Sequence, residues 1–204
     1  MAHSTVRKLF NIASIGDVNY WAIPKCGNTS IKAFLLHRYL RLDISSLNPS
    51  ESNNFVHKEG VGFCYLTPQK ALENGRHNIT FVRDPTERFK SLYADFCTRR
   101  SNPGLPGFFG MTVDACLAEI EQQFAKNNEK DINPHLRSQS YYLRDFKGSI
   151  FQISDFKNIR INLTRGRVLF TEDQLNRIQI IYSGDRQLLE RTTPIERFFE
   201  LVDG

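Results

Sequence analysis

The segment Pro24–Lys32, PKCGNTSIK, holds the residue types that bind an anion. It follows a short apolar run, Val18–Ile23, and leads into an amphipathic stretch, so we expect a strand, a tight loop and the start of a helix. The main-chain N–H groups of such a loop point at a bound anion, and the helix dipole adds a favourable potential. Lys25 supplies a full positive charge, while Thr29 and Ser30 supply hydroxyl donors. The segment therefore predicts a phosphorylated ligand.

A second segment, Arg83–Ser91, reads RDPTERFKS and follows a predicted strand, Asn78–Val82. Arg83 leaves the end of that strand and Ser91 lies two turns into the next predicted helix, so both side chains can face one phosphate group. The arginines of this segment could instead pair with its own acidic residues. The segment alone does not decide between these two interpretations.

The loop differs from the phosphate loop of nucleotide kinases and ATPases. Those proteins use G-x-x-x-x-G-K-[ST], with a late lysine and a hydroxyl that binds Mg²⁺. Here Lys25 comes two residues before Gly27, and Asp84, which follows an apolar strand, is better explained by helix capping. We therefore expect an anion that is handled without a metal. A sulfuryl group meets this requirement because a phosphosulfate carries less charge than a triphosphate.

Together, PKCGNTS and RDPTERFKS resemble the two phosphate sites of sulfotransferases that use 3′-phosphoadenosine 5′-phosphosulfate (PAPS). The likeness is closest to the Golgi-type carbohydrate sulfotransferases, whose second site reads R-D-P-x-x-R-x-x-S-x-Y. Asn133–Gln139 is similar to their D-x-H-x-x-P-Q segment, with Ser138 in place of the proline, and Tyr182–Leu188 is similar to their Y-x-x-D-x-x-L segment. The resemblance extends from Asn19 to Leu189.

The resemblance implies in-line transfer of the sulfuryl group from PAPS, the co-substrate, to an acceptor hydroxyl or amine. Lys25 would approach the oxygen that bridges phosphate and sulfate, where negative charge grows as the bond breaks. Arg83 and Ser91 would bind the 3′-phosphate. The residues implied to bind the 5′-phosphosulfate are Lys25, Cys26, Gly27, Asn28, Thr29 and Ser30.

An acceptor hydroxyl also needs a general base within hydrogen-bonding distance. His57 is predicted to end a short strand, Asn54–His57, and so to lie at the carboxyl edge of the sheet beside the anion loop. The resemblance also implies a catalytic histidine or glutamate near this point, and Glu59 is the competing base. In the third family-like segment, His135 and Gln139 are candidates for contact with the acceptor, and the cofactor is the other possible partner of His135.

The alternation of strand-like and helical segments predicts an α/β fold, with a central, mostly parallel sheet flanked by helices, of the P-loop nucleotide-binding type. Ligands of such sheets bind beyond the carboxyl ends of the strands, which is where the anion loop falls. We expect one sulfotransferase domain over residues 1–204, with a cofactor-binding core over residues 18–190. The predicted strands are Val18–Ile23, Asn54–His57, Asn78–Val82 and Ser149–Ile153, and the predicted helices run from Pro85 to Cys97, onward from the cap Thr112, and from Thr171 to Tyr182.

The composition agrees with a globular protein whose partner is an anion. The 204 residues carry a net charge of +5, with a pI of about 9.1, although charge alone fits a plain basic protein equally well. The arginines are dispersed, which speaks against nucleic acid as a partner. Two alternatives remain: a P-loop kinase, and a non-catalytic module that binds a polyanion or a nucleotide.

The four cysteines form no C-x-x-C pair and no zinc-type cluster, so we expect free thiols in a reducing compartment and no metal site. No apolar run approaches 18 residues and no signal peptide stands out, so we expect a cytoplasmic protein without a membrane span. A piece cut from an anchored enzyme would show the same features. The expected partner is an acceptor, a glycan or a small hydroxyl compound, and the sequence leaves the oligomeric state open.

Overall fold

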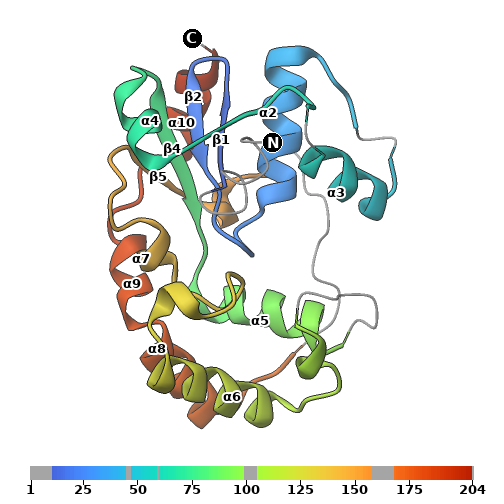
Figure 1. Cartoon of the computed structure of the whole chain (residues 1–204), viewed down its shortest axis with the longest axis vertical. Coiled ribbons are helices and arrows are strands. Elements are labelled where there is room, and N and C mark those ends of the chain that lie inside the picture. Colours follow the sequence, from blue (N-terminus) through green and yellow to red (C-terminus); the bar gives the residue numbers. More distant parts are fainter. Residues whose placement is uncertain (1–10, 45–46, 59, 99–104, 158–167, 204) are drawn as a thin grey trace. The chain divides into compact units, whose positions relative to one another are not determined.

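The computed structural model describes residues 11–44, 47–58, 60–98, 105–157 and 168–203 (Figure 1). The chain forms two compact units, each built from segments that are distant in the sequence. The first unit comprises Met1–Val82, Asp145–Leu163 and Arg191–Gly204, and the second comprises Arg83–Arg144 and Thr164–Glu190. The expectation of a single domain with a core over residues 18–190 stays a prediction.

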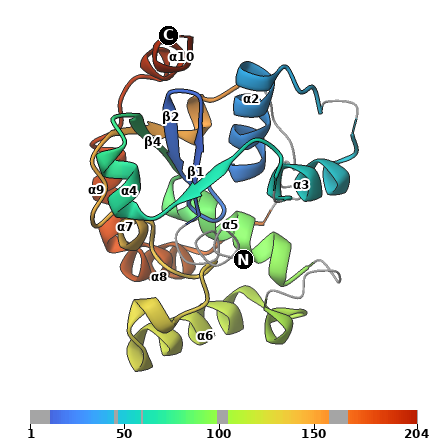
Figure 2. The same ribbon diagram turned by 45° about the horizontal axis from the view of Figure 1, so that its top comes forward.

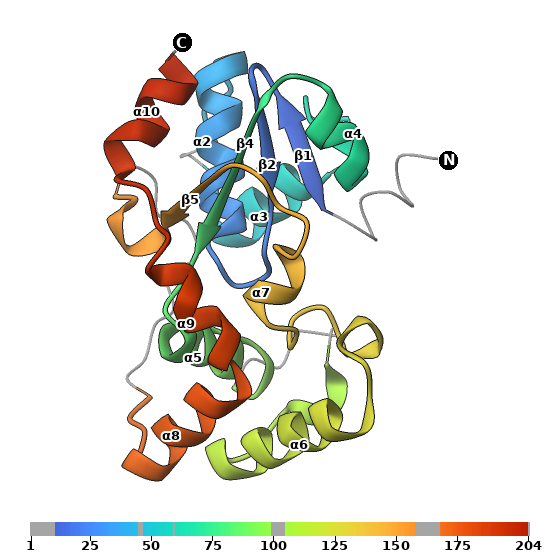
Figure 3. The ribbon, with the colours of Figure 1, turned by 90° about the vertical axis from the view of Figure 1, so that its left-hand side faces the viewer.

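The described part of the first unit contains a five-stranded sheet in the order β3-β1-β2-β4-β5. Figure 3 shows β4 between β2 and β5. The strands are β1 Ile12–Ile15, β2 Val18–Trp21, β3 Cys64–Leu66, β4 His77–Val82 and β5 Ser149–Gln152.

The sheet is mixed, so the expectation of a mostly parallel sheet goes too far. The parallel pairings join β2 to β4 and β4 to β5, and these are the three predicted strands that the structure contains. The antiparallel pairings join β1 to β2 and β1 to β3. Strands β1 and β3 are short, and the sequence pattern did not reveal them. The predicted α/β class, with a sheet flanked by helices, is confirmed.

Helices cover both faces of this sheet because successive residues of a strand point to opposite sides. On β2, the Tyr20 hydroxyl donates to Asn28 Oδ1 at the start of α2, at 2.7 Å. The neighbouring Asn19 side chain donates instead to the carbonyl of Ala71 in α4, at 2.9 Å. In the described part of the first unit, the helices are α2 Asn28–Leu40, α3 Pro49–His57, α4 Pro68–Glu73 and α10 Ile195–Asp203, with a 3₁₀ turn η3 at Ile153–Asp155.

The predicted strand Asn54–His57 is wrong, because these residues form the end of α3. The helix starts from a reciprocal cap in which the main-chain N–H of Glu51 donates to Asn48 Oδ1 at 3.0 Å and that of Asn48 donates to Glu51 Oε2 at 3.1 Å. Pro49 stands at the first helical position, where proline is favoured. This local capping outweighs the β-propensity of the Phe55–Val56 pair.

An aromatic cluster closes the core of the first unit between the sheet and α10. The ring of Phe198 lies 5.1 Å from that of Phe81, 5.5 Å from that of Phe151 and 5.5 Å from that of Phe34. The pairs of Phe198 with Phe81 and Phe151 are edge-on, an arrangement that adds to the free energy that burial provides. In Figure 2, α2 runs beside β2 of this sheet.

The second unit is helical in its described part, and its main helices begin where the sequence predicts. Asp84 caps α5, Thr112 caps α6, and Thr171 caps α8 through a complete capping box with Gln174. Helix α8 packs against α5 and α6 (Figure 3). The elements are α5 Pro85–Phe96, η1 Pro106–Phe108, α6 Val113–Lys126, η2 Glu129–Asp131, α7 Gln139–Tyr142, α8 Glu172–Ile181 and α9 Ser183–Leu189.

Within the described ranges, no helix is long and apolar enough to cross a membrane. No disulfide joins the cysteines, all four of which belong to the described residues.

Candidate active site

The anion loop lies where predicted, between β2 and α2 of the first unit. The main-chain N–H of Cys26 donates to the carbonyl of Ile23 at 3.2 Å, which closes a tight turn. Lys25 and Gly27 both adopt left-handed backbone conformations, with φ values of 69° and 78°. At Gly27 a side chain would also collide with Ile153, whose Cδ1 lies 2.6 Å from the position of an added Cβ. Glycine is therefore favoured there by the left-handed conformation, and any larger residue would also need Ile153 to shift.

The first turn of α2 presents a positive helix end to this loop. Gly27 is the N-cap, and the first turn holds no acidic residue. The main-chain N–H groups of a first helical turn take no part in the helix's own hydrogen bonding, and the helix dipole raises the potential around them. This end of α2 can therefore stabilise an anion with main-chain groups alone.

Side chains at the loop are held by hydrogen bonds to β2 on one side and to α3 on the other. Burial raises the pKa of Tyr20 well above its usual value, so its hydroxyl stays protonated and donates to Asn28. Thr29 Oγ1 donates to Asn53 Oδ1 of α3 at 2.9 Å. Cys26 and Ser30 are buried, whereas Lys25 is partly exposed. Binding of the 5′-phosphosulfate by these residues stays a prediction.

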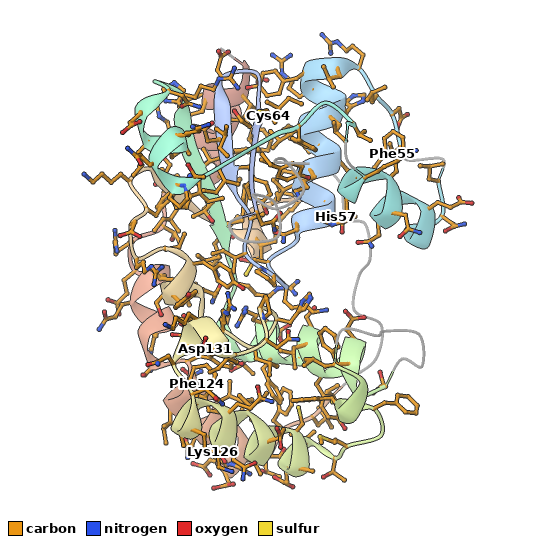
Figure 4. All side chains as sticks on the ribbon, viewed as in Figure 1. Phe55, His57, Cys64, Phe124, Lys126 and Asp131 are labelled. Carbon is orange, nitrogen blue, oxygen red and sulfur yellow. The ribbon has the colours of Figure 1, made fainter. Side chains whose placement is uncertain are left out.

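His57 lies at the end of α3, beside α2, and not at the end of a strand (Figure 4). Its Nδ1 is 3.5 Å from Nζ of Lys32 on α2. With the Thr29–Asn53 bond, this contact makes a second link between α3 and the first turns of α2. His57 therefore lies in the same unit as the anion loop because α3 contacts α2, and not because His57 ends a strand as the sequence interpretation expected. Glu59, the competing base, lies outside the described residues.

Lys32 is the main residue of this region that the sequence analysis overlooked. Its side chain is fully buried, and Nζ donates to Asn11 Oδ1 at 3.2 Å and to the Tyr65 hydroxyl at 3.4 Å. The same Nζ lies 5.2 Å from the centre of the Tyr65 ring, within reach of a cation–π interaction. A signal was present, because Leu35 and Leu36, which follow Lys32 by one turn on the same helix face, are both apolar.

The segment of the predicted 3′-phosphate site belongs to the second unit. Arg83 is joined by one peptide bond to Val82, the last residue of β4, and Asp84 then caps α5 by accepting from the Glu87 N–H at 3.0 Å. Ser91 lies in α5 and is partly exposed. Arg88 is buried and donates to the main-chain carbonyl of Arg137 at 2.7 Å. Capping thus accounts for Asp84, as predicted.

The two candidate acceptor residues occupy different surroundings in the second unit. The His135 ring packs edge-on against Phe96, with the ring centres 5.0 Å apart. Gln139 is fully buried, and its amide bonds the main chain of Arg83. Ser138, which replaces the proline of the resembling enzymes, caps α7 by accepting from the Tyr141 N–H at 3.0 Å. Contact of His135 and Gln139 with an acceptor stays a prediction.

Among the described residues, no three His, Cys, Asp or Glu side chains are grouped so that they could hold a metal ion.

The chain belongs to the sulfotransferase family, whose model matches residues 10–188. This range contains both segments that are predicted to bind phosphate and every candidate site residue named above. The family that the motifs resemble is therefore confirmed, and sulfuryl transfer is its chemistry. Neither the curated proteins nor the solved structures yield a match to the chain.

Proposed function

We propose that this protein transfers the sulfuryl group of PAPS, in line and without a metal, to an acceptor hydroxyl or amine on a carbohydrate. The observation that carries the proposal is the loop between β2 and α2. Its left-handed Lys25 and Gly27 lead into a helix end that has no acidic residue in its first turn. Main-chain amides and one lysine suit the charge of a phosphosulfate.

In this proposal the loop residues Cys26–Ser30 bind the 5′-phosphosulfate, and Lys25 donates to the bridging oxygen as the sulfur–oxygen bond breaks. The electron pair of that bond stays on the phosphate, and the sulfuryl group passes to the acceptor oxygen. Arg83 and Ser91 bind the 3′-phosphate through charge-assisted hydrogen bonds. The parallel pairing of β2 with β4 supports this assignment, because the two strands end at the same edge of the sheet and Arg83 follows β4 directly.

The acceptor must lose a proton as it attacks, and His57 and Glu59 are the two proposed bases. His57 has the better structural support, because its contact with Lys32 ties its ring to the helix that begins at the anion loop. His135 is proposed to contact the acceptor. The proposed chemical class of the acceptor, a glycan or a small hydroxyl compound, rests on the resemblance to the Golgi-type enzymes. The cytoplasmic location of the protein also stays a prediction.

The proposal is tested by calorimetry with 3′-phosphoadenosine 5′-phosphate (PAP), the product of the reaction, with and without Mg²⁺. We expect binding that does not depend on Mg²⁺ and that weakens strongly in Arg83→Ala and Ser91→Ala. Arg197→Ala serves as the control, since this exposed arginine pairs with Glu200 on its own helix.

Two outcomes would reject the proposal in favour of its alternatives. Strict dependence on Mg²⁺ would indicate a P-loop kinase. Weak binding of PAP, equal to that of other polyanions, would indicate a non-catalytic binding module. Transfer of radiolabelled sulfate from PAPS to a panel of glycans and small alcohols would then identify the acceptor.

A further inference from the structure

The side-chain amide of Gln139 binds both main-chain polar groups of one residue, Arg83. Gln139 Oε1 accepts from the Arg83 N–H at 2.8 Å, and Gln139 Nε2 donates to the Arg83 carbonyl at 2.7 Å. A side-chain amide that pairs in this way acts like the neighbouring strand of a sheet. It fixes the backbone of Arg83 at the point where the chain has left β4 and has not yet entered α5.

A buried carboxylate sets the orientation of that amide. Asp185 is fully buried in α9, and its Oδ2 accepts a second hydrogen bond from Gln139 Nε2 at 3.2 Å. Its Oδ1 accepts from the Ser140 N–H at 2.9 Å. A reversed amide would place the Gln139 oxygen against the carboxylate and its NH₂ group against the Arg83 N–H, so only one orientation satisfies every group.

The same contacts leave Gln139 to act through Arg83 and not by direct contact with a ligand. Its side chain has no exposed surface, and its oxygen and nitrogen are engaged by Arg83 and Asp185. The direction in which a side chain leaves the backbone follows from the backbone's position, so a residue that holds the Arg83 main chain also aims the Arg83 guanidinium.

We propose that Gln139, oriented by Asp185, is a positioning residue that aims Arg83 at the 3′-phosphate of PAPS. This inference rests on the proposed function, because it takes Arg83 as the 3′-phosphate ligand. It gives Gln139 a role in selecting the nucleotide, in place of the acceptor contact expected from the sequence.

The test compares PAP with adenosine 5′-phosphate, which lacks the 3′-phosphate, by calorimetry on Gln139→Met. Methionine keeps the approximate volume and removes every hydrogen bond of the amide. We expect PAP to bind roughly 10- to 100-fold more weakly, as for the loss of a hydrogen bond to a charged group, and adenosine 5′-phosphate to bind as in the wild type. In an Arg83→Ala background, Gln139→Met should cause no further loss of PAP affinity.

Two controls separate positioning from a general loss of stability. Leu117→Ala removes a buried side chain of α6 in the same unit and should lower the melting temperature without changing the ratio of the two affinities. Asp185→Asn keeps the volume and should reduce the ratio less than Gln139→Met does. It also provides the measurement if Gln139→Met does not fold.

Unchanged PAP affinity in Gln139→Met, or in Asp185→Asn where that variant replaces it, would overturn the inference. So would equal weakening of both nucleotides, or a loss of affinity that adds to that of Arg83→Ala. Failure of the proposed function looks different, because the wild-type protein would then bind PAP no better than adenosine 5′-phosphate.

Discussion

Lys25 and Lys32 lie in the same segment but have opposite surroundings, and these surroundings suggest different roles. Lys25 is partly exposed, on a left-handed turn at the start of the loop. Lys32 is fully buried among Asn11, Tyr65 and His57. An exposed ammonium can meet a ligand, whereas a buried one with several partners organises the protein around it. We therefore propose that Lys25 acts in the chemical step and that Lys32 supports His57.

Replacement of Lys25 by alanine should slow sulfate transfer far more than it weakens PAP binding. The charge that Lys25 is proposed to stabilise develops mainly in the transition state, so we expect kcat to fall on the order of 10²- to 10³-fold. Transfer of labelled sulfate measures kcat, and calorimetry measures the affinity for PAP. Lys70→Ala, at an exposed site on α4, is the control. A wild-type kcat in Lys25→Ala would contradict the assignment.

Replacement of His57 by alanine should remove most turnover and leave PAP affinity nearly unchanged. A general base contributes typically about 10²- to 10⁴-fold to a rate, and it contacts the acceptor rather than the nucleotide. His37→Ala offers a matched control, because His37 is exposed at the far end of α2. If His57→Ala turns over normally and Glu59→Ala does not, the base is Glu59.

At the scale of elements, the turn into α2 depends on Gly27, and this dependence can be measured. Gly27→Ala should destabilise the protein by about 1–2 kcal/mol for the left-handed backbone, with an added cost from the contact with Ile153. Gly75→Ala is a close control, because Gly75 has a φ of 74° and no atom within 4 Å of an added Cβ. Urea denaturation should show the larger loss for Gly27→Ala. Equal losses would mean that Ile153 moves aside freely.

Elements with local signals were predicted well from the sequence. The capping residues of α5, α6 and α8 mark their starts, and the apolar runs of β2, β4 and β5 mark the parallel strands. Helix α3 was missed although Asn48 and Glu51 form a recognisable capping box, because the apolar pair that follows was given more weight. Strand β3 has only three residues, too few to show a period. Strand β1 has four, as many as β2 and β5, so its length does not explain why it was missed.

The residues of the candidate site also divide into those with a local sequence signal and those without one. The anion loop is local, so its lysine, glycine and helix start could be recognised in one segment. The contacts of Lys32 with Asn11 and Tyr65, and of Gln139 with Arg83 and Asp185, join residues that are remote in the sequence. Their motifs indicated that these residues matter, but only the folded chain shows what they touch.

At the scale of the whole molecule, the four thiols differ sharply in exposure. Cys64 on β3 is exposed, whereas Cys26, Cys97 and Cys116 are buried. A hydrogen bond with Cys97, together with burial, raises the pKa of Cys116, and the same hydrogen bond lowers the pKa of Cys97.

We therefore expect one thiol to react rapidly with a water-soluble thiol reagent in the native protein and four to react in denaturant. A thiolate is the reactive form, but it must also be reached by the reagent. Absorbance after addition of an aromatic disulfide reagent counts the thiols, and Cys64→Ser should abolish the rapid phase. Two or more rapid thiols in the native protein would show that a buried cysteine is accessible.

The aromatic cluster that α10 completes has a consequence for how the protein is made. A ribosome finishes β4 at Val82 but adds Phe198 only after the whole second unit has been synthesised. Until then, Phe81 and Phe151 lack their contact with Phe198, and that part of the sheet is open to contact with other nascent chains. The yield of folded protein in a cell should therefore depend on chaperones that shield this part of the sheet. A chain that stops at Leu189 would hold every residue proposed for the site and still lack the helix that packs Phe198 against Phe81.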